Sequence, residues 1–195
     1  MNTAKSQEGR RTLAVVVPFL NEEENLPVLY ERLVKMMAGQ PEALRIVFVD
    51  DGSRDGSAQW VADVARRDDR VTLLRLSRNF GHQIAITAGM DHAEADAVVI
   101  IDADLQDPPE VIPDLLAKWR EGYEVVYAVR SSRAGETWLK KFLAASFYRV
   151  FHRMASVEVP MDAGDFRLID RKVVDALRDV RELHRFMRGL TCWVG

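Results

Sequence analysis

Short apolar runs alternate with segments of helical periodicity along the first 130 residues of the chain. Runs rich in β-branched or aliphatic residues predict strands at 13–17, 46–49, 71–76 and 97–101. The first, second and fourth runs are almost continuously apolar, which is typical of parallel strands covered on both faces. A fifth strand is expected at 123–130, where the sequence reads YEVVYAVR.

Helical patterns fill the intervals between these strands. In 26–37 apolar residues recur at three- and four-residue spacing, and Asn25 is expected to cap that helix. A second helix is expected around 60–65, after the turn DGSRDGS, and a third at 83–93. Further along, a helix is expected after Pro108 and Pro109, a loop leading into a short strand at 162–171, and a short helix at 172–177.

This alternation predicts the α/β fold class, with a doubly wound, mostly parallel sheet flanked by helices. In such sheets ligands bind beyond the carboxyl ends of the strands. Polar clusters follow the first four predicted strands, at 18–22, 50–51, 78–81 and 102–107. We therefore expect all four clusters to lie along one edge of the sheet.

Composition and charge narrow the classes of function. With 195 residues, 48% of them hydrophobic and 29% charged, the chain has the makeup of an ordinary globular domain with its own core. A net charge of −3 is too small to indicate nucleic-acid binding. The single cysteine, Cys192, excludes an intrachain disulfide and favours a reducing compartment. No run approaches about 18 consecutive apolar residues, so no membrane span is expected.

Asp102 and Asp104 stand in the segment IDADLQDPPE, directly after a predicted buried strand. Two carboxylates placed so close together repel, and a cation between them relieves the repulsion. Oxygen ligands without neighbouring Cys or His favour Mg²⁺ or Mn²⁺, and magnesium typically bridges to substrate phosphates. Alternatively, these aspartates cap the next helix and solvate a turn, and the pattern alone leaves both interpretations open. Asp107, just before Pro108, fits the start of a helix better than a third metal ligand.

Three motifs at strand ends carry a family resemblance. The chain has neither a P-loop nor a G-x-G-x-x-G dinucleotide motif; instead its strands end in VVVPFLNEEENLP, FVDDGSRDGS and IDADLQDPPE. In this order the motifs resemble the family-2 glycosyltransferases of GT-A fold. The later segments LSRNFGHQIAITAGMDHA, AVRSSRAGETW, GDFRLIDRKVV and RFMRGLTCWVG are similar to the polyprenyl-phosphate branch, which includes bactoprenol glucosyltransferases and dolichyl-phosphate mannose synthases.

The resemblance implies an inverting, metal-dependent transfer of a hexose from a nucleotide sugar to a polyprenyl phosphate. Glucose, UDP-glucose and undecaprenyl (bactoprenol) phosphate are the favoured sugar, donor and acceptor. Asp102, Asp104 and Gln106 match the metal site for Mg²⁺ or Mn²⁺. The implied nucleotide-sugar contacts are Pro18, Asn21, Glu22, Asp50, Asp51, Arg78, Asn79, Asp102 and Ala103. Alternatively, residues 50–52 only form a turn, and Glu22 only interacts with the dipole at the start of the following helix.

A basic, amphipathic segment follows the fifth predicted strand. The resemblance places Arg130, Arg133 and Lys140 in the cradle of the acceptor phosphate. From Thr137 onward the segment has the composition of a helix that lies on an anionic membrane surface. Lys141, Arg149 and Arg153 are expected to face lipid headgroups or water.

Asp165, in GDFRLID, matches the aspartate usually named the catalytic base of the branch. A prenyl phosphate, however, has a second pKa near 6 and is largely deprotonated at neutral pH. Such a nucleophile needs no strong base. We therefore expect Asp165 mainly to orient the acceptor or to balance charge, with a strand-entry turn as the structural alternative.

The expected organisation is a flexible tail at 1–11 and one catalytic domain at 12–195, with a donor half at 12–129 and an acceptor half at 130–195. Members of the branch continue beyond the last motif into membrane segments, so we expect either a truncated catalytic domain or a soluble variant. The expected location is the cytoplasmic side of the plasma membrane, and homo-oligomers are compatible with the sequence. Two other functions stay open: glycan elongation on a hydroxyl acceptor, and a non-catalytic module that binds nucleotide sugars.

Overall fold

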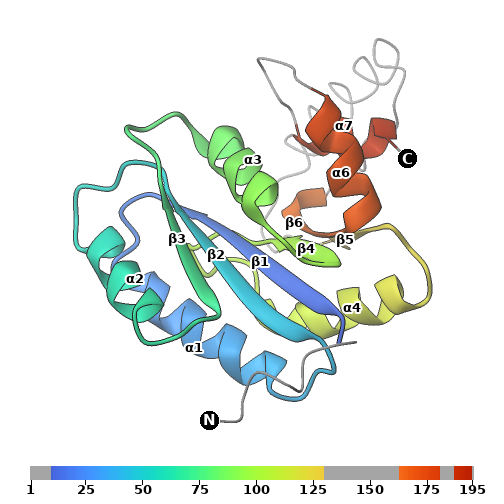
Figure 1. Cartoon of the computed structure of the whole chain (residues 1–195), viewed down its shortest axis with the longest axis horizontal. Coiled ribbons are helices and arrows are strands. Elements are labelled where there is room, and N and C mark those ends of the chain that lie inside the picture. The colour runs from blue at the N-terminus through green and yellow to red at the C-terminus, as the bar shows by residue number, and fades with distance from the viewer. Residues whose placement is uncertain (1–9, 130–162, 181–186, 195) are drawn as a thin grey trace, which may run out of the picture.

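The computed structural model describes residues 10–129, 163–180 and 187–194 of the chain. These residues form a sheet with helices on both of its faces (Figure 1). The strands are β1 (Thr12–Phe19), β2 (Ala43–Asp50), β3 (Val71–Arg75), β4 (Ala97–Ile100), β5 (Val125–Val129) and β6 (Ala163–Asp170). The helices are α1 (Asn25–Met37), α2 (Ser57–Ala65), α3 (His82–His92), the 3-10 turn η1 (Pro109–Val111), α4 (Ile112–Arg120), α6 (Arg171–Asp179) and α7 (Met187–Val194).

The strands are arranged in the order β3-β2-β1-β4-β6-β5. The first four strands of this order are parallel, whereas β6 runs antiparallel to both β4 and β5. Because β1 to β4 point the same way, the loops after them meet at one edge. The prediction of an α/β fold with a mostly parallel, doubly wound sheet is confirmed.

Two apolar cores lie on opposite faces of the sheet. Leu13, Val15 and Val17 of β1 belong to the core under α1, α2 and α4, while Ala14 and Val16 of β1 belong to the core under α3 and α6. This division follows from the two-residue alternation of side chains along a strand. Figure 1 shows the same layers, with α1, α2 and α4 on one side and α3, α6 and α7 on the other.

Helix α3 packs closely against the sheet because the residues on its inner face have small side chains. A Cβ atom added at Gly89 would lie 2.3 Å from Val16 Cγ1 and 3.0 Å from Val49 Cγ2. Only glycine permits this approach, and the fully buried Ala85 continues the same narrow face. The close packing fixes the start of α3, at His82, beside the carboxyl end of the sheet.

Two local predictions were wrong. Asn25 is the first residue of α1 rather than its cap, and its side-chain amide donates to Glu22 Oε2 at 2.7 Å. Residues 163–170 form a full strand of eight residues rather than a loop leading into a short strand. The strand extends this far because it pairs on both sides, with β4 and with β5.

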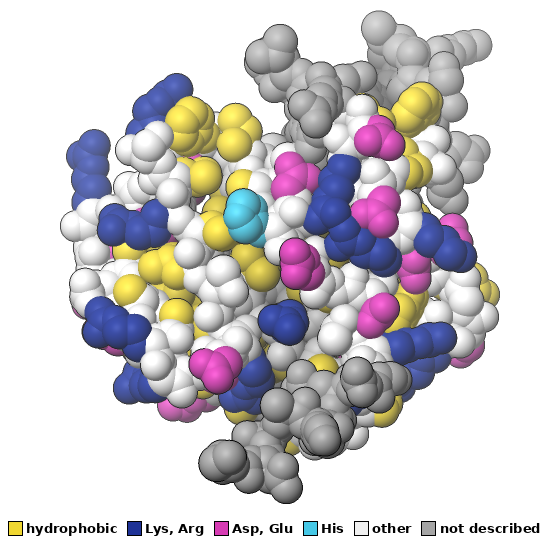
Figure 2. Space-filling view, in the orientation of Figure 1, with side chains coloured by type: hydrophobic (Ala, Val, Ile, Leu, Met, Phe, Trp, Pro, Cys, Tyr) yellow, Lys and Arg dark blue, Asp and Glu magenta, His cyan; other side chains and the backbone are white. Residues whose placement is uncertain are grey.

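The surface in the view of Figure 2 mixes acidic and basic side chains rather than separating them. Ion pairs such as Arg32 with Glu110, and Lys172 with Glu124, join separate elements of the fold. Within the described ranges, no helix is both long and apolar enough to cross a membrane. The expected basic helix after Thr137 lies outside the described residues.

Candidate active site

A cleft of about 300 Å³ opens at the carboxyl edge of the parallel strands. Its lining comes from the end of β1, from the segments after β1, β2, β3 and β4, as expected from the polar clusters in the sequence, and from the start of α3. The residues that line it are Pro18, Phe19, Leu20, Glu22, Asp51, Asn79, Gly81, His82, Ala85, Asp102, Ala103 and Asp104. Four of these are acids and none is a lysine or arginine, so an anionic ligand at this cleft requires a cation from elsewhere.

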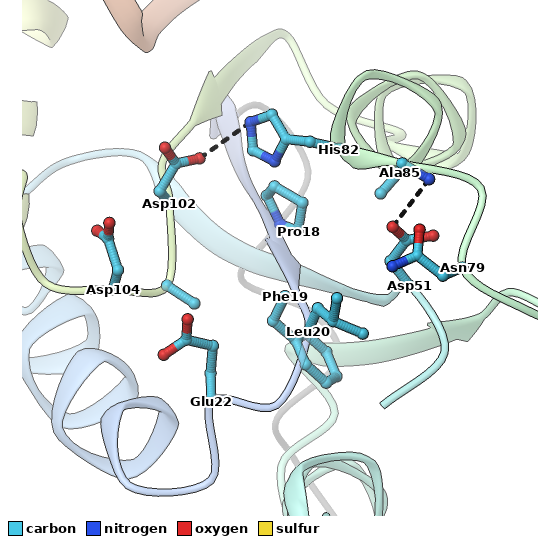
Figure 3. Close-up of a pocket in the computed structure, with 12 residues that line it drawn as sticks. Pro18, Phe19, Leu20, Glu22, Asp51, Asn79, His82, Ala85, Asp102 and Asp104 are labelled. Carbon is cyan, nitrogen blue, oxygen red and sulfur yellow. Dashed lines mark hydrogen bonds and ion pairs between the residues drawn. The ribbon is translucent and has the colours of Figure 1, made fainter. Parts of the chain in front are cut away.

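Asp102 and Asp104 both face the cleft (Figure 3). Asp102 Oδ1 is buried and accepts no hydrogen bond of good geometry within the described structure. Burial raises the pKa of Asp102; His82 opposes that rise, and the carboxylates of Asp165, Asp104 and Asp107 add to it. A buried carboxylate oxygen with neighbouring negative charge is a suitable ligand for a divalent cation.

The turn that carries Asp104 is strained at one residue. Leu105 adopts a φ of +61°, a conformation that costs a residue other than glycine about 1–3 kcal/mol. Its side chain packs against the core below α1 and α4, while the N–H of Gln106 donates to Asp104 Oδ1 at 3.0 Å. Core packing on one side and this hydrogen bond on the other hold the turn, and with it Asp104, at the cleft.

Asp51 fixes the loop between β3 and α3. Its two carboxylate oxygens accept hydrogen bonds from the N–H groups of Phe80, at 2.8 Å, and Gly81, at 3.0 Å. Gly52, with a φ of +87°, lets the backbone pass close to this loop, because an added Cβ would lie 2.7 Å from the backbone nitrogen of Asn79. Asp51 therefore lines the cleft and also places the residues that begin α3.

The segments after β1 and β2 are tied together by hydrogen bonds. The N–H of Asn21 donates to Ser53 Oγ at 2.9 Å, and Asn21 Oδ1 accepts from the N–H of Arg54 at 2.8 Å. The N–H of Glu22 donates to Ser57 Oγ at 2.9 Å. These contacts give that side of the cleft a fixed shape.

Asp165 and His82 connect the cleft to the antiparallel strands. His82 Nε2 lies 3.3 Å from Asp102 Oδ1 and 3.5 Å from Asp165 Oδ2. Arg167 Nη2 donates to Asp165 Oδ1 at 2.8 Å, and Arg167 Nη1 donates to Thr191 Oγ1 at 2.9 Å. Two acids, Asp102 and Asp165, and two bases, His82 and Arg167, thus form one continuous group.

The structure brings most, but not all, of the predicted donor residues to the cleft. Pro18, Glu22, Asp51, Asn79, Asp102 and Ala103 line it. Asn21, Asp50, Arg78 and the side chain of Gln106 are outside the lining. Asp50 is fully buried and bonds to the N–H of Ser53 and to Arg75 Nε, and exposed Arg78 stacks on Phe80 at 4.1 Å. Arg130, Arg133 and Lys140 lie outside the described residues.

Sequence reasoning missed two residues of this group. His82 directly follows the polar cluster 78–81 after β3, and this adjacency was the available signal. Arg167 lies within a strand, where nothing in the local pattern marks it as a partner of Asp165. Both become visible only when β6 is placed beside β4.

Residues 14–178 match the sequence profile of the family described as "Glycosyl transferase family 2". The chain is a family-2 glycosyltransferase. The "Uncharacterized glycosyltransferase YkcC" of Bacillus subtilis is 52% identical over 182 residues, which cover 93% of this chain and 56% of that protein. The "Bactoprenol glucosyl transferase" of Shigella phage SfV is 41% identical over 183 residues, covering 94% of this chain and 60% of the relative. This glycosyltransferase chain therefore spans somewhat over half the length of these relatives.

Solved structures share the fold of this family-2 glycosyltransferase. Glucosyl-3-phosphoglycerate synthase from Mycobacterium tuberculosis, solved with Mn²⁺, UDP-glucose and phosphoglyceric acid, superposes with a TM-score of 0.60 at 17% identity. The match covers 84% of this chain and 57% of that one. At this identity the likeness establishes the GT-A fold alone.

Proposed function

We propose that this chain catalyses the metal-dependent transfer of a hexose from a nucleotide sugar to a polyprenyl phosphate, with inversion at the anomeric carbon. The favoured donor is UDP-glucose and the favoured acceptor is undecaprenyl phosphate. The observation that carries the proposal is the acid-lined cleft at the strand ends. There, among the described residues, Asp102 Oδ1 is buried with His82 Nε2 at 3.3 Å and with no hydrogen bond of good geometry. Family membership and the printed name of the bactoprenol glucosyl transferase relative support the choice of substrates.

Asp102 and Asp104 are the residues that would hold Mg²⁺ or Mn²⁺. No group of three Cys, His, Asp or Glu side chains in the described part of the chain is arranged to hold a metal, so the two aspartates would share the ion with the donor diphosphate and water. Bound there, the ion supplies charge neutralisation for the departing nucleoside diphosphate. Gln106 remains a proposed helper at this position.

The other lining residues suit the nucleoside and the sugar. Asp51 has both oxygens hydrogen-bonded to backbone N–H groups, yet each oxygen keeps a second lone pair for a ribose hydroxyl or base N–H. Pro18 and Phe19 provide an apolar floor beside it, and Asn79 and Glu22 complete the proposed donor contacts. Asp50 acts through the turn that it stabilises rather than from the lining.

The acceptor phosphate attacks the anomeric carbon, and the bond from that carbon to the donor's diphosphate oxygen breaks. The nucleoside diphosphate leaves with the electron pair of that bond. Because the attacking oxygen already carries negative charge at neutral pH, no proton has to be removed in this step. Asp165 therefore orients the acceptor. Arg167 Nη2 holds the Asp165 carboxylate in place by donating a hydrogen bond to its Oδ1 at 2.8 Å.

The acceptor half, 130–195, contributes Arg130, Arg133 and Lys140 to phosphate binding in this proposal. Their guanidinium and ammonium groups would supply the positive charge that the described lining lacks. The reaction would take place at the cytoplasmic surface of the plasma membrane, where the polyprenyl acceptor is embedded.

A screen of donors against one lipid acceptor tests the proposal. The chain is incubated with Mn²⁺ or Mg²⁺, radiolabelled UDP- or GDP-sugars and undecaprenyl phosphate in detergent, and label in the organic phase is counted. Labelled lipid is the expected result, with UDP-glucose as the best donor. Transfer only to a glycan hydroxyl would support the elongation alternative instead, and donor binding without any transfer would support a binding module.

A further inference from the structure

Asn21 lies in the segment that lines one side of the cleft, but it is not part of the lining. Within 18–22, all of which the structure describes, Asn21 is the residue outside the lining, whereas its two neighbours, Leu20 and Glu22, both lie at the cleft (Figure 3). The backbone turns at this point, since Asn21 adopts a φ of +57°. Asparagine enters this left-handed region more readily than most residues other than glycine. The turn therefore lets the residues on both sides of Asn21 reach the cleft.

Asn21 is held by two consecutive residues of the turn after β2. Its N–H donates to Ser53 Oγ at 2.9 Å, and its Oδ1 accepts from the N–H of Arg54 at 2.8 Å. That turn is anchored in the core, because the N–H of Ser53 donates to Oδ1 of the fully buried Asp50 at 2.7 Å. The side chain of Asn21 is thus engaged by the backbone of the neighbouring turn rather than directed into the cleft.

Glu22, the next residue, is held in a definite orientation at the cleft. Its N–H donates to Oγ of the fully buried Ser57 at 2.9 Å, and its Oε2 accepts from Asn25 Nδ2 at 2.7 Å. Each carboxylate oxygen has two lone pairs, so Glu22 can still accept a hydrogen bond from a hydroxyl of a nucleotide sugar. Because Glu22 directly follows Asn21, the place of this carboxylate at the cleft depends on the path of the chain through Asn21.

We propose that Asn21 is a positioning residue for the nucleotide sugar, which holds Glu22 at the cleft through the turn after β2 and does not touch the ligand. This inference rests on the proposed function of the cleft. It gives Asn21 a different task from the direct contact that the family resemblance implies. A residue with this task affects how tightly the nucleotide sugar binds, whereas the transfer of the bound sugar does not depend on it.

The first test compares substitutions of Asn21 by calorimetry, with UDP added to the chain in the presence of Mn²⁺. Asn21→Ala removes the acceptor for the N–H of Arg54 and fits a φ of +57° poorly, whereas Asn21→Asp keeps the acceptor and tolerates that φ. We expect Asn21→Ala to weaken UDP binding about 10-fold and Asn21→Asp to recover most of the loss. Glu24→Ala is the matched control, because Glu24 is exposed in the same loop and its side chain makes no capping hydrogen bond.

Direct contact with the ligand predicts the opposite order of affinities. If Asn21 touched the diphosphate, the negative charge added by Asn21→Asp would repel it. Weaker UDP binding by Asn21→Asp than by Asn21→Ala would therefore overturn the proposal. Glu24→Ala should bind UDP like the wild type.

A double-mutant cycle tests the route through the turn. Ser53 accepts from the N–H of Asn21 and is not part of the cleft lining. Since Asn21→Ala and Ser53→Ala act on the same contact between two loops, the double variant should bind UDP about as weakly as the weaker single variant. Losses that multiply in the double variant would show two independent effects and would overturn the proposal.

Initial rates separate this role from a loss of folded protein. Asn21→Ala should raise the KM for the nucleotide sugar about 10-fold and leave kcat unchanged. A lowered kcat at unchanged KM is what a smaller folded fraction would produce, and that result would overturn the proposal.

The positioning role and the proposed function can fail separately. Wild-type UDP binding by Asn21→Ala, in a chain that transfers sugar to undecaprenyl phosphate, overturns the positioning role and leaves the proposed function intact. Weakened UDP binding by Asn21→Ala that Asn21→Asp restores, in a chain that transfers no sugar to undecaprenyl phosphate, supports the positioning role and removes the proposed acceptor.

Discussion

Asp165 and Arg167 form a buried ion pair in which Arg167 Nη2 lies 2.8 Å from Asp165 Oδ1 and the arginine side chain has no exposed surface. The guanidinium also contacts Thr191 at 2.9 Å and lies over the ring of Tyr127 at 5.6 Å. A carboxylate fixed in this way is suited to orienting an anionic acceptor through the cations that bind it, because a carboxylate and a phosphate repel each other directly. The proposed reaction does not require the carboxylate of Asp165 to take up a proton, because the proposed acceptor phosphate is already an anion.

The first prediction concerns Asp165→Asn. The amide keeps the shape of the side chain but weakens its interaction with Arg167, so the acceptor is misplaced and kcat falls about 100-fold. The pH dependence of the remaining activity, measured from pH 5 to 9, should keep its wild-type shape. A large alkaline displacement of that profile would instead show that Asp165 removes a proton in the wild type.

The second prediction concerns the stability that Arg167 provides. Arg167→Ala removes the guanidinium from the buried carboxylate of Asp165, and breaking a buried ion pair by removing one partner typically costs about 3–5 kcal/mol of unfolding free energy. Urea denaturation followed by circular dichroism measures this loss. Arg45→Ala, at an exposed position of β2, is the control and should change the unfolding free energy by less than about 0.5 kcal/mol. Similar losses of unfolding free energy for Arg167→Ala and Arg45→Ala would mean that the buried ion pair adds no more stability than an exposed arginine.

The third prediction follows from the raised pKa of Asp102, caused chiefly by its burial. An aspartate has an ordinary pKa of about 3.9 in the unfolded chain. Since the folded pKa is higher, Asp102 favours the folded state below that ordinary value, and the advantage is lost as pH rises through the folded pKa. At neutral pH, and without metal, Asp102→Asn should therefore be more stable than the wild type.

Thermal unfolding measured as a function of pH checks this sign. The difference in Tm between Asp102→Asn and wild type should be positive at pH 7 and should shrink below about pH 4, where Asp102 is protonated in both states. Addition of Mn²⁺ should raise the Tm of the wild type and leave that of the variant unchanged. A variant less stable than wild type at pH 7 would show that the ionised Asp102 is stabilising in the folded chain.

The fourth prediction compares two glycines. In Gly52→Ala the new Cβ meets the backbone nitrogen of Asn79 at 2.7 Å and the residue must keep a φ of +87°. Strain of this kind costs about 1–3 kcal/mol and displaces the loop that carries Asn79 and leads into α3. Gly39→Ala adds its methyl group where nothing lies within 4 Å, so it serves as the control. Calorimetry should show weaker UDP binding for Gly52→Ala alone, and equal binding by the two variants would argue against a fixed loop.

The sequence predicted much of this fold because its strongest patterns are local. The buried runs of β1, β2 and β4 and the spacing of Leu26, Leu29 and Leu33 indicate strands and a helix without knowledge of their partners. The insertion of β6 between β4 and β5 could not be predicted in the same way. Its pairing, for example Val99 with Leu168, joins residues far apart in the chain, and no local pattern encodes such a contact.

In the candidate site, too, some residues could be predicted from local sequence and others could not. Asp102 and Asp104 could be placed at the cleft because they follow a buried strand in a parallel sheet. The contact of His82 with Asp165 depends on the position of β6, and the burial of Arg167 depends on α7. Such contacts appear only after the strands and helices are assembled.

In the proposed function, Asp102 and Asp104 bind the donor's diphosphate through a divalent cation. Isothermal titration of UDP-glucose into the chain, with Mn²⁺ or with EDTA, tests it most directly. Binding should require Mn²⁺ in the wild type, persist in Asp69→Asn at an exposed position before β3, and be lost in Asp102→Asn. Equal affinity of wild type and Asp102→Asn for UDP-glucose, or binding that is indifferent to EDTA, would contradict the claim.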